Sequence, residues 1–187
     1  MPGINGEKTG PIVAEPAPAV AATGAGAAPA APPPDFEPTI LAFACHWCTY
    51  SGADLAGLNR MNYPANVRVL RVPCSGRVNP QHALAALNKG VDGVLICGCH
   101  PGDCHYVSGN YFAKRRLMAF KRLLEYTGLE PERFQVRWIS GSEAGKFRDT
   151  VISVCEQVRK LGPYVPDPGK APIDSLPPRH SEGGDAQ

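Results

Sequence analysis

Three short apolar runs in the middle of the chain each lead into cysteine, and this arrangement most constrains the fold. The runs span residues 40–44, 67–72 and 94–96. If they are parallel strands, their carboxyl ends meet at one edge of one sheet, and the thiols that follow them collect there. These thiols belong to Cys45, Cys48, Cys74, Cys99 and Cys104.

The surrounding sequence alternates between strand and helix patterns. Asn79 is placed to cap a helix whose first turn holds Pro80, and Gly90 and Gly128 are placed to end helices. Such alternation with short connections predicts an α/β fold: a small parallel four-stranded sheet with flanking helices and cysteine loops at the carboxyl ends of the strands. The expected strands are 39–44, 67–72, 92–97 and 134–139, and the expected helices are 49–60, 79–89, 110–126 and 142–160.

Both ends of the chain differ from this core in composition. Residues 1–38 contain 9 prolines and 10 alanines, and residues 163–187 contain 6 prolines. Neither end has enough large apolar side chains to offset the entropy of ordering, so both are expected to be disordered tails. A single domain is therefore predicted over residues 39–162.

Charge and localisation signals narrow the class of protein. The predicted domain has 16 Lys and Arg against 9 Asp and Glu, a net of +7, which favours docking to an acidic protein surface. No basic–aromatic nucleic-acid motif accompanies this charge. No secretory signal and no run of about 20 apolar residues is recognisable, so a cytoplasmic protein without a membrane span is expected. In a reducing compartment, seven cysteines point to metal or redox use rather than to disulfides.

The cysteine spacing favours an iron–sulfur cluster. Cys45 and Cys48 form a C-x2-C, and Cys99 and Cys104 form a C-x4-C. These are the ligand spacings of plant-type [2Fe–2S] proteins, here divided between two loops. Short spacing is expected to bring the two thiolates of each motif to one iron. These four cysteines are the favoured ligands, and Cys74 is a fifth thiol that competes with them.

Two other uses of the same thiols remain open at this point. Cys45 and Cys48 at a strand-to-helix turn also fit a thioredoxin-like dithiol oxidoreductase. Four thiolates, or thiolates with His46, His100 or His105, would also fit a zinc-stapled interaction module.

Residues around the thiols have expected supporting roles. Cys97 within a strand and Cys155 within a helix are expected to be buried and inert. His100 and His105 are expected to support the cluster without ligating it. Trp47 and Tyr50 are expected either to cover the cluster from water or to pack as ordinary core residues. A basic run within 114–122 is a solvated helix face or a docking patch. No recognised catalytic motif is present.

Three motifs resemble the delta subunit family of methyl-viologen-reducing hydrogenase. They lie at 45–50, 71–78 and 98–106, and the similarity covers about residues 39–160. The resemblance implies a subunit that carries one [2Fe–2S] cluster on cysteines and has no bond-making chemistry of its own. It also implies electron relay between a hydrogenase or formate dehydrogenase and the FAD-containing subunit of heterodisulfide reductase. The implied ligand candidates are Cys45, Cys48, Cys74, Cys99 and Cys104.

Overall fold

The computed structural model describes residue 33 and residues 35–166. The two predicted tails, 1–38 and 163–187, lie mostly outside these described residues. Among the described helices, none is both long enough and apolar enough to cross a membrane.

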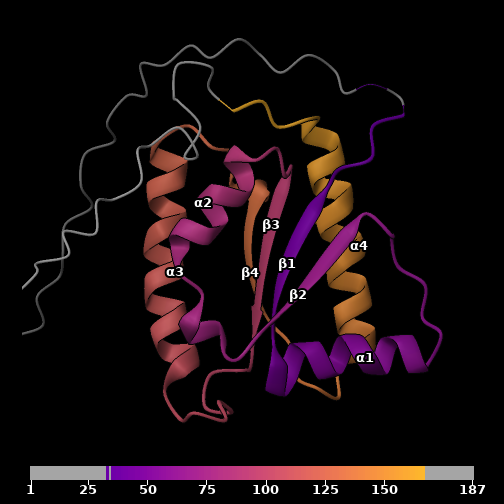
Figure 1. Ribbon diagram of the computed structural model, residues 1–187, viewed down its shortest axis with the longest axis vertical. Helices are drawn as coiled ribbons and strands as arrows, with labels where there is room; N and C mark the ends of the chain where they lie inside the picture. The colour runs from indigo at the N-terminus through magenta and orange to yellow at the C-terminus, as the bar shows by residue number, and fades with distance from the viewer. Residues whose placement is uncertain (1–32, 34, 167–187) are drawn as a thin grey trace, which may run out of the picture.

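A four-stranded parallel sheet forms the centre of the domain (Figure 1). Its order is β2-β1-β3-β4, and every neighbouring pair is parallel. The α/β prediction is therefore confirmed, with strand boundaries within about one residue of those expected. The strands are β1 (Ile40–Cys45), β2 (Val67–Val72), β3 (Gly93–Gly98) and β4 (Phe134–Trp138).

Helices cover both faces of this sheet (Figure 1). One face is covered by α1 and α4, and the opposite face by α2 and α3. The helices are α1 (Ser51–Leu58), α2 (Pro80–Asn88), α3 (Gly109–Tyr126) and α4 (Ala144–Leu161).

The central strands are buried because they have helices on both sides. All six residues of β3 are buried, whereas the edge strand β2 alternates between more buried and more exposed positions over most of its length. Parallel strands that are covered on both faces have continuous apolar sequences, and for this reason the apolar run at 94–96 identifies a strand in the sequence.

Local sequence signals set the helix ends. The Asn79 side chain accepts a hydrogen bond from the N–H of Gln81 at 3.0 Å, so the predicted cap of α2 is confirmed. Gly90 and Gly128 follow α2 and α3 with φ of 87° and 89°, a conformation that favours glycine.

The strand order places a topological switch between β1 and β3. The chain leaves β1 for β2 on one side and then crosses to β3 on the other. In open parallel sheets, ligands bind outside the carboxyl ends of the strands at such a point. The cysteine loops after β1 and β3 lie there, at the lower edge of the sheet in Figure 1.

Candidate metal centre

Five thiols meet at the carboxyl edge of the sheet. Cys45 ends β1, and Cys48 lies in the single π-helical turn His46–Tyr50 that follows it. Cys74 follows β2, and the loop after β3 supplies the other two. All five are buried, with exposures of 1% for Cys45, 6% for Cys48, 3% for Cys74, 3% for Cys99 and 8% for Cys104.

The sulfurs form two groups. The Sγ atoms of Cys45, Cys48 and Cys99 all lie within 4.8 Å of one another. The Sγ atoms of Cys74 and Cys104 lie 3.8 Å apart. The two groups adjoin, because Cys45 Sγ lies 3.9 Å from the carbonyl oxygen of Pro73, the residue before Cys74.

This grouping differs from the one expected from spacing. Cys99 joins the C-x2-C motif across the central strands, at 3.8 Å from Cys45 Sγ, while Cys104 turns to Cys74. The loop turns on both sides of Cys104: Gly102 has a φ of 103° and Val107 a φ of 63°, and the N–H groups of Asp103 and Val107 donate to the carbonyl oxygens of His100 and Cys104 at 2.9 Å and 2.8 Å. A positive φ at a β-branched residue such as Val107 is a genuine outlier, and such strain clusters at functional sites.

Hydrogen bonds shift the pKa values of Cys45 and Cys48 in opposite directions. The hydrogen bond from Cys48 lowers the pKa of Cys45 to about 5, and the N–H groups of Trp47 and Ser75 act in the same direction. The same hydrogen bond to Cys45, together with burial, raises the pKa of Cys48. Thiolates are the form that binds metal, so this direction of the pKa shift suits metal binding at Cys45.

The pKa values of the other three thiols, Cys74, Cys104 and Cys99, are also shifted in different directions. Burial raises the pKa of the Cys74 thiol to about 11, although the N–H of Gly76 opposes this. Burial also acts to raise the pKa of Cys104, but backbone N–H groups of Tyr106, Asn110 and Gly109 outweigh it and the pKa is lowered. Burial raises the pKa of Cys99. Backbone N–H donors are the partners that thiolates in metal sites normally have.

Glycine permits the close approach of α3 to the second group. A β carbon at position 109 would lie 2.5 Å from Cys74 Sγ and 3.1 Å from Cys104 Sγ. Any other residue there would displace a sulfur. Sequence reasoning starts this helix at Asn110 and misses Gly109, although a Ser-Gly pair directly before a helix is a usable signal.

The remaining buried polar atoms without partners also lie at this site. Among the described residues, they are Ser75 Oγ, His46 Nδ1 and Asn110 Oδ1. Ser75 and His46 directly follow cysteines, and Asn110 Nδ2 donates to the carbonyl oxygens of Cys99 (3.3 Å) and His100 (2.5 Å). Buried polar groups usually have partners, so this concentration marks a place built around a polar group. Burial, soft sulfur donors and N–H groups together fit an iron–sulfur cluster.

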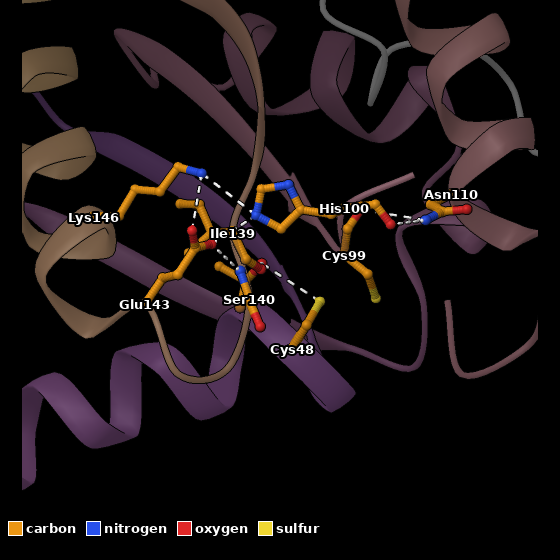
Figure 2. Close-up of polar contacts among 9 residues, drawn as sticks. Cys48, Cys99, His100, Asn110, Ile139, Ser140, Glu143 and Lys146 are labelled. Carbon is orange, nitrogen blue, oxygen red and sulfur yellow. Dashed lines mark hydrogen bonds and ion pairs between the residues drawn. The ribbon is translucent and has the colours of Figure 1, made fainter. Parts of the chain in front are cut away.

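His100 faces away from the sulfurs and toward α4 (Figure 2). Its Nε2 lies 2.7 Å from Glu143 Oε2 and 3.4 Å from Lys146 Nζ. Glu143 also accepts from the Ser140 N–H at 2.7 Å, and this bond, with those from His100 and Lys146, lowers its pKa to about 2. This network ties the loop after β3 to the start of α4. Sequence reasoning places Glu143 at the acidic start of the last helix but predicts neither its contact with His100 nor any role for the Lys146 side chain.

Trp47 and His105 lie together at the surface of the site. Their rings stack with centroids 3.7 Å apart, and Trp47 Nε1 donates to Tyr106 Oη at 3.2 Å. Trp47 is 47% exposed, so it joins two cysteine loops without entering the core. His105 stacks on Trp47 in the structure, and its expected supporting role beside a cluster stays a prediction.

The other two cysteines lie apart from the site. Cys97 packs in the apolar core against the α1 and α4 face, and burial raises its pKa to about 12. Cys155 lies in α4, where burial raises its pKa to about 11. Both positions agree with the predicted buried placement.

With the site described, known proteins can be compared with it. Residues 40–162 match the family model for the methyl-viologen-reducing hydrogenase delta subunit. The chain belongs to this family.

Delta-subunit relatives are covered over nearly their whole length. The chain is 52% identical over 130 residues to an F420-non-reducing hydrogenase iron-sulfur subunit of Archaeoglobus profundus, covering 70% of this chain and 95% of the relative. It is 46% identical over 140 residues to the F420-non-reducing hydrogenase vhc iron-sulfur subunit of Methanococcus voltae, covering 75% and 97%.

A second kind of relative is much longer. The chain is 43% identical over 126 residues to a ferredoxin:CoB-CoM heterodisulfide reductase subunit of Methanosarcina mazei. The match covers 67% of this chain but only 16% of the relative. A segment similar to this chain therefore forms a small part of that longer subunit.

Proposed function

We propose that this chain is an electron-transfer subunit that carries one [2Fe–2S] cluster on cysteines of the carboxyl-edge loops. When bound, such a cluster takes up and releases single electrons. The observation that carries the proposal is the gathering of five buried thiols, from three loops, at the switch point of the sheet. No bond-making step is assigned to the chain.

The proposed partners follow from the relatives. The hydrogenase relatives support a hydrogenase on one side of the relay, with formate dehydrogenase as the alternative donor that the family resemblance implies. The longer relative supports a heterodisulfide reductase subunit on the other side. That this subunit contains FAD is what the family resemblance implies. Two domains that occur within one polypeptide in one organism are suited to contact each other as separate chains in another. We place the relay in the cytoplasm, where thiols stay reduced.

The surface beside the thiols is suited to a protein partner. Trp47, Tyr106 and Val107 are 47%, 51% and 79% exposed, and Tyr111 and Phe112 continue the apolar character into α3. Exposed apolar residues gathered in one region mark interaction sites. The docking patch expected within 114–122 has one fewer side chain available to a partner, because Arg116 donates hydrogen bonds to the loop after Cys74.

One observation favours a different function. A low pKa at Cys45 beside a high pKa at Cys48 is the pattern of a dithiol oxidoreductase. However, both sulfurs are buried, with exposures of 1% and 6%, which does not suit attack on a disulfide substrate. The cluster remains the proposal that uses all of the site.

The deciding experiment is purification of the chain under anaerobic conditions, followed by measurement of iron, acid-labile sulfide and zinc. Iron and sulfide in equal amounts, about two of each per chain, with broad visible absorption that bleaches on reduction, is the expected result. Zinc without sulfide would establish the stapled module instead. A metal-free chain that reduces disulfides would establish the dithiol enzyme.

A further inference from the structure

Exposed large apolar side chains gather on α3 and in the residues just before it. Twelve such side chains are exposed among the described residues, and seven of them lie within 106–126. The other long helix of the domain, α4, has the same length of 18 residues and contributes none of the twelve. The five on α3 are 46% to 84% exposed, and they are Tyr111, Phe112, Met118, Leu123 and Tyr126.

These five side chains share one face of the helix, which we call the outer face of α3. Met118 lies about two turns after Tyr111, Leu123 lies about three turns after Phe112, and Tyr126 falls between these two rows. The buried residues of α3 are on the opposite face and pack toward the sheet; they are Asn110, Ala113, Leu117 and Leu124. A helix that is apolar on one face only is expected at the surface of a domain, whereas α3 is apolar on two faces.

Basic side chains lie among the apolar ones on the outer face. Arg115 and Arg122 are seven residues apart and lie on the same side of the helix as Met118. The Arg115 guanidinium stands 5.0 Å from the centroid of the Phe112 ring, so its charge is held directly beside the apolar surface. The whole helix contains five basic residues and a single acidic residue, Glu125. The surface that complements this face is apolar and flanked by carboxylates.

The same charges disfavour a second copy of the chain as the occupant. If two α3 helices packed antiparallel about the middle of the outer face, Arg115 of one copy would lie opposite Arg122 of the other. Parallel packing would place each of these arginines opposite its own equivalent. Like charges that face each other across an interface cost binding free energy.

We propose that the outer face of α3 is the docking surface for an amphipathic helix of a partner protein, and that Asp and Glu flank the apolar side of that helix. From Tyr111 to Tyr126 the face is about 22 Å long, enough for about four turns of a helix packed lengthwise. Apolar anchors at helical spacing are the usual means by which such a helix binds. The proposal goes beyond the proposed function, because it concerns the surface of α3 and holds whichever metal the thiols bind.

The outer face begins at the thiol site. A β carbon at position 102, in the loop between Cys99 and Cys104, would lie 3.9 Å from Tyr111 Oη. The first residue of α3, Gly109, lies against the sulfurs of Cys74 and Cys104. A partner helix that lies along α3 therefore has one end beside the buried thiols, which suits a partner that exchanges electrons with them.

The test is a photo-cross-link from the outer face in the full chain, expressed in its own host. Met118→p-benzoylphenylalanine carries the probe, and Leu58→p-benzoylphenylalanine on α1 is the matched control, because Leu58 is also an exposed apolar residue. Mass spectrometry identifies the cross-linked segment. We expect the Met118 probe to attach to a helix of another protein that has apolar residues three and four apart and more Asp and Glu than Lys and Arg. The Leu58 probe should not reach that segment.

A charge reversal tests the chemistry of the partner. Arg115→Glu combined with Arg122→Glu, in the chain that carries the Met118 probe, should lower the cross-link yield about tenfold. Lys160→Glu reverses an exposed charge on α4 and should leave the yield unchanged. If the double variant does not fold, Arg122→Glu alone provides the comparison. Equal yields in the Arg and Lys variants would overturn the acidic partner.

Each other outcome of the cross-link also overturns the proposal. These outcomes are no cross-link, a cross-link to a second copy of the chain, to its own residues 1–32 or 167–187, to a basic or non-helical segment, or to the same segment from position 58. Iron and acid-labile sulfide should be unchanged in all of these variants. Loss of docking is therefore distinct from a wild-type chain without iron and sulfide, which overturns the proposed function alone.

Discussion

The backbone of Gly109 lies directly against the sulfur of Cys74, so that a β carbon at position 109 would lie 2.5 Å from it. The same β carbon would lie 3.1 Å from the sulfur of Cys104. The first turn of α3 thus serves as a wall of the thiol site, and its N–H groups face Cys104. Glycine is required here for close packing, since no positive φ is involved.

Gly109→Ala is therefore expected to push apart the Cys74 and Cys104 sulfurs and to lower the iron content of the purified chain. Gly57→Ala is the matched control, because a β carbon at position 57 meets nothing within 4 Å. That control should retain iron and gain up to about 1 kcal/mol of unfolding free energy in α1. Equal iron in both variants would contradict the proposed contact.

Arg116→Gln tests the tether between α3 and the loop after Cys74. Loss of two hydrogen bonds from a charged donor should lower the unfolding free energy by about 1–3 kcal/mol, measured by urea denaturation. It should also speed the release of iron to a chelator. Lys114→Gln removes an exposed charge from the same helix and should change neither quantity measurably. Equal unfolding free energies and equal rates of iron release in the two variants would show that Arg116 does not stabilise the loop after Cys74.

Glu143 is expected to make stability depend on acid pH. Its pKa is about 2 in the folded chain against 4.5 ordinarily, because Ser140, His100 and Lys146 favour the carboxylate. The stabilisation is complete above about pH 4.5 and is lost as the pH falls toward 2. Denaturation of wild-type and Glu143→Gln protein, compared at about pH 6 and about pH 3, should show the larger loss in wild type. A parallel loss in both would show that another group carries the acid sensitivity.

Trp47→Ala tests the bridge between the two cysteine loops. Loss of the stack on His105 and of the hydrogen bond to Tyr106 should lower global stability by only about 1 kcal/mol, because Trp47 is half exposed. Iron loss to a chelator should nevertheless accelerate, since the loops separate more easily. Leu58→Ala removes a side chain that is 75% exposed and is the control. An unchanged rate of iron loss to the chelator in Trp47→Ala would show that Trp47 does not hold the two cysteine loops together.

The sheet is predictable because its strands carry their own signal. The buried run around Val94 to Ile96 and the alternation in β2 identify strands without any tertiary information. Because a helix lies between each strand and the next, the strands are expected to be parallel, and their carboxyl ends bring the cysteines to one edge of the sheet. The strand order is not predictable in this way, because hydrophobic pattern does not distinguish which neighbour each strand selects.

The pairing of the thiols does not follow from local sequence. Spacing groups Cys99 with Cys104, but in the structure Cys99 lies against Cys45 and Cys104 against Cys74, in a loop with positive φ at Gly102. Likewise, the ion pair of His100 with Glu143 joins positions 43 residues apart. Contacts of this kind depend on how loops pack against helices, which local pattern does not encode.

The separation of Cys45 from Cys99 along the chain has a consequence for biosynthesis. Because the two cysteines are 54 positions apart and the whole β2–α2 unit lies between them, no early fragment of the nascent polypeptide contains both. An ion bridging them can enter only after β3 has left the ribosome and docked beside β1. Loading of a metal at these two thiols is accordingly expected to follow the pairing of β1 with β3 rather than to precede it.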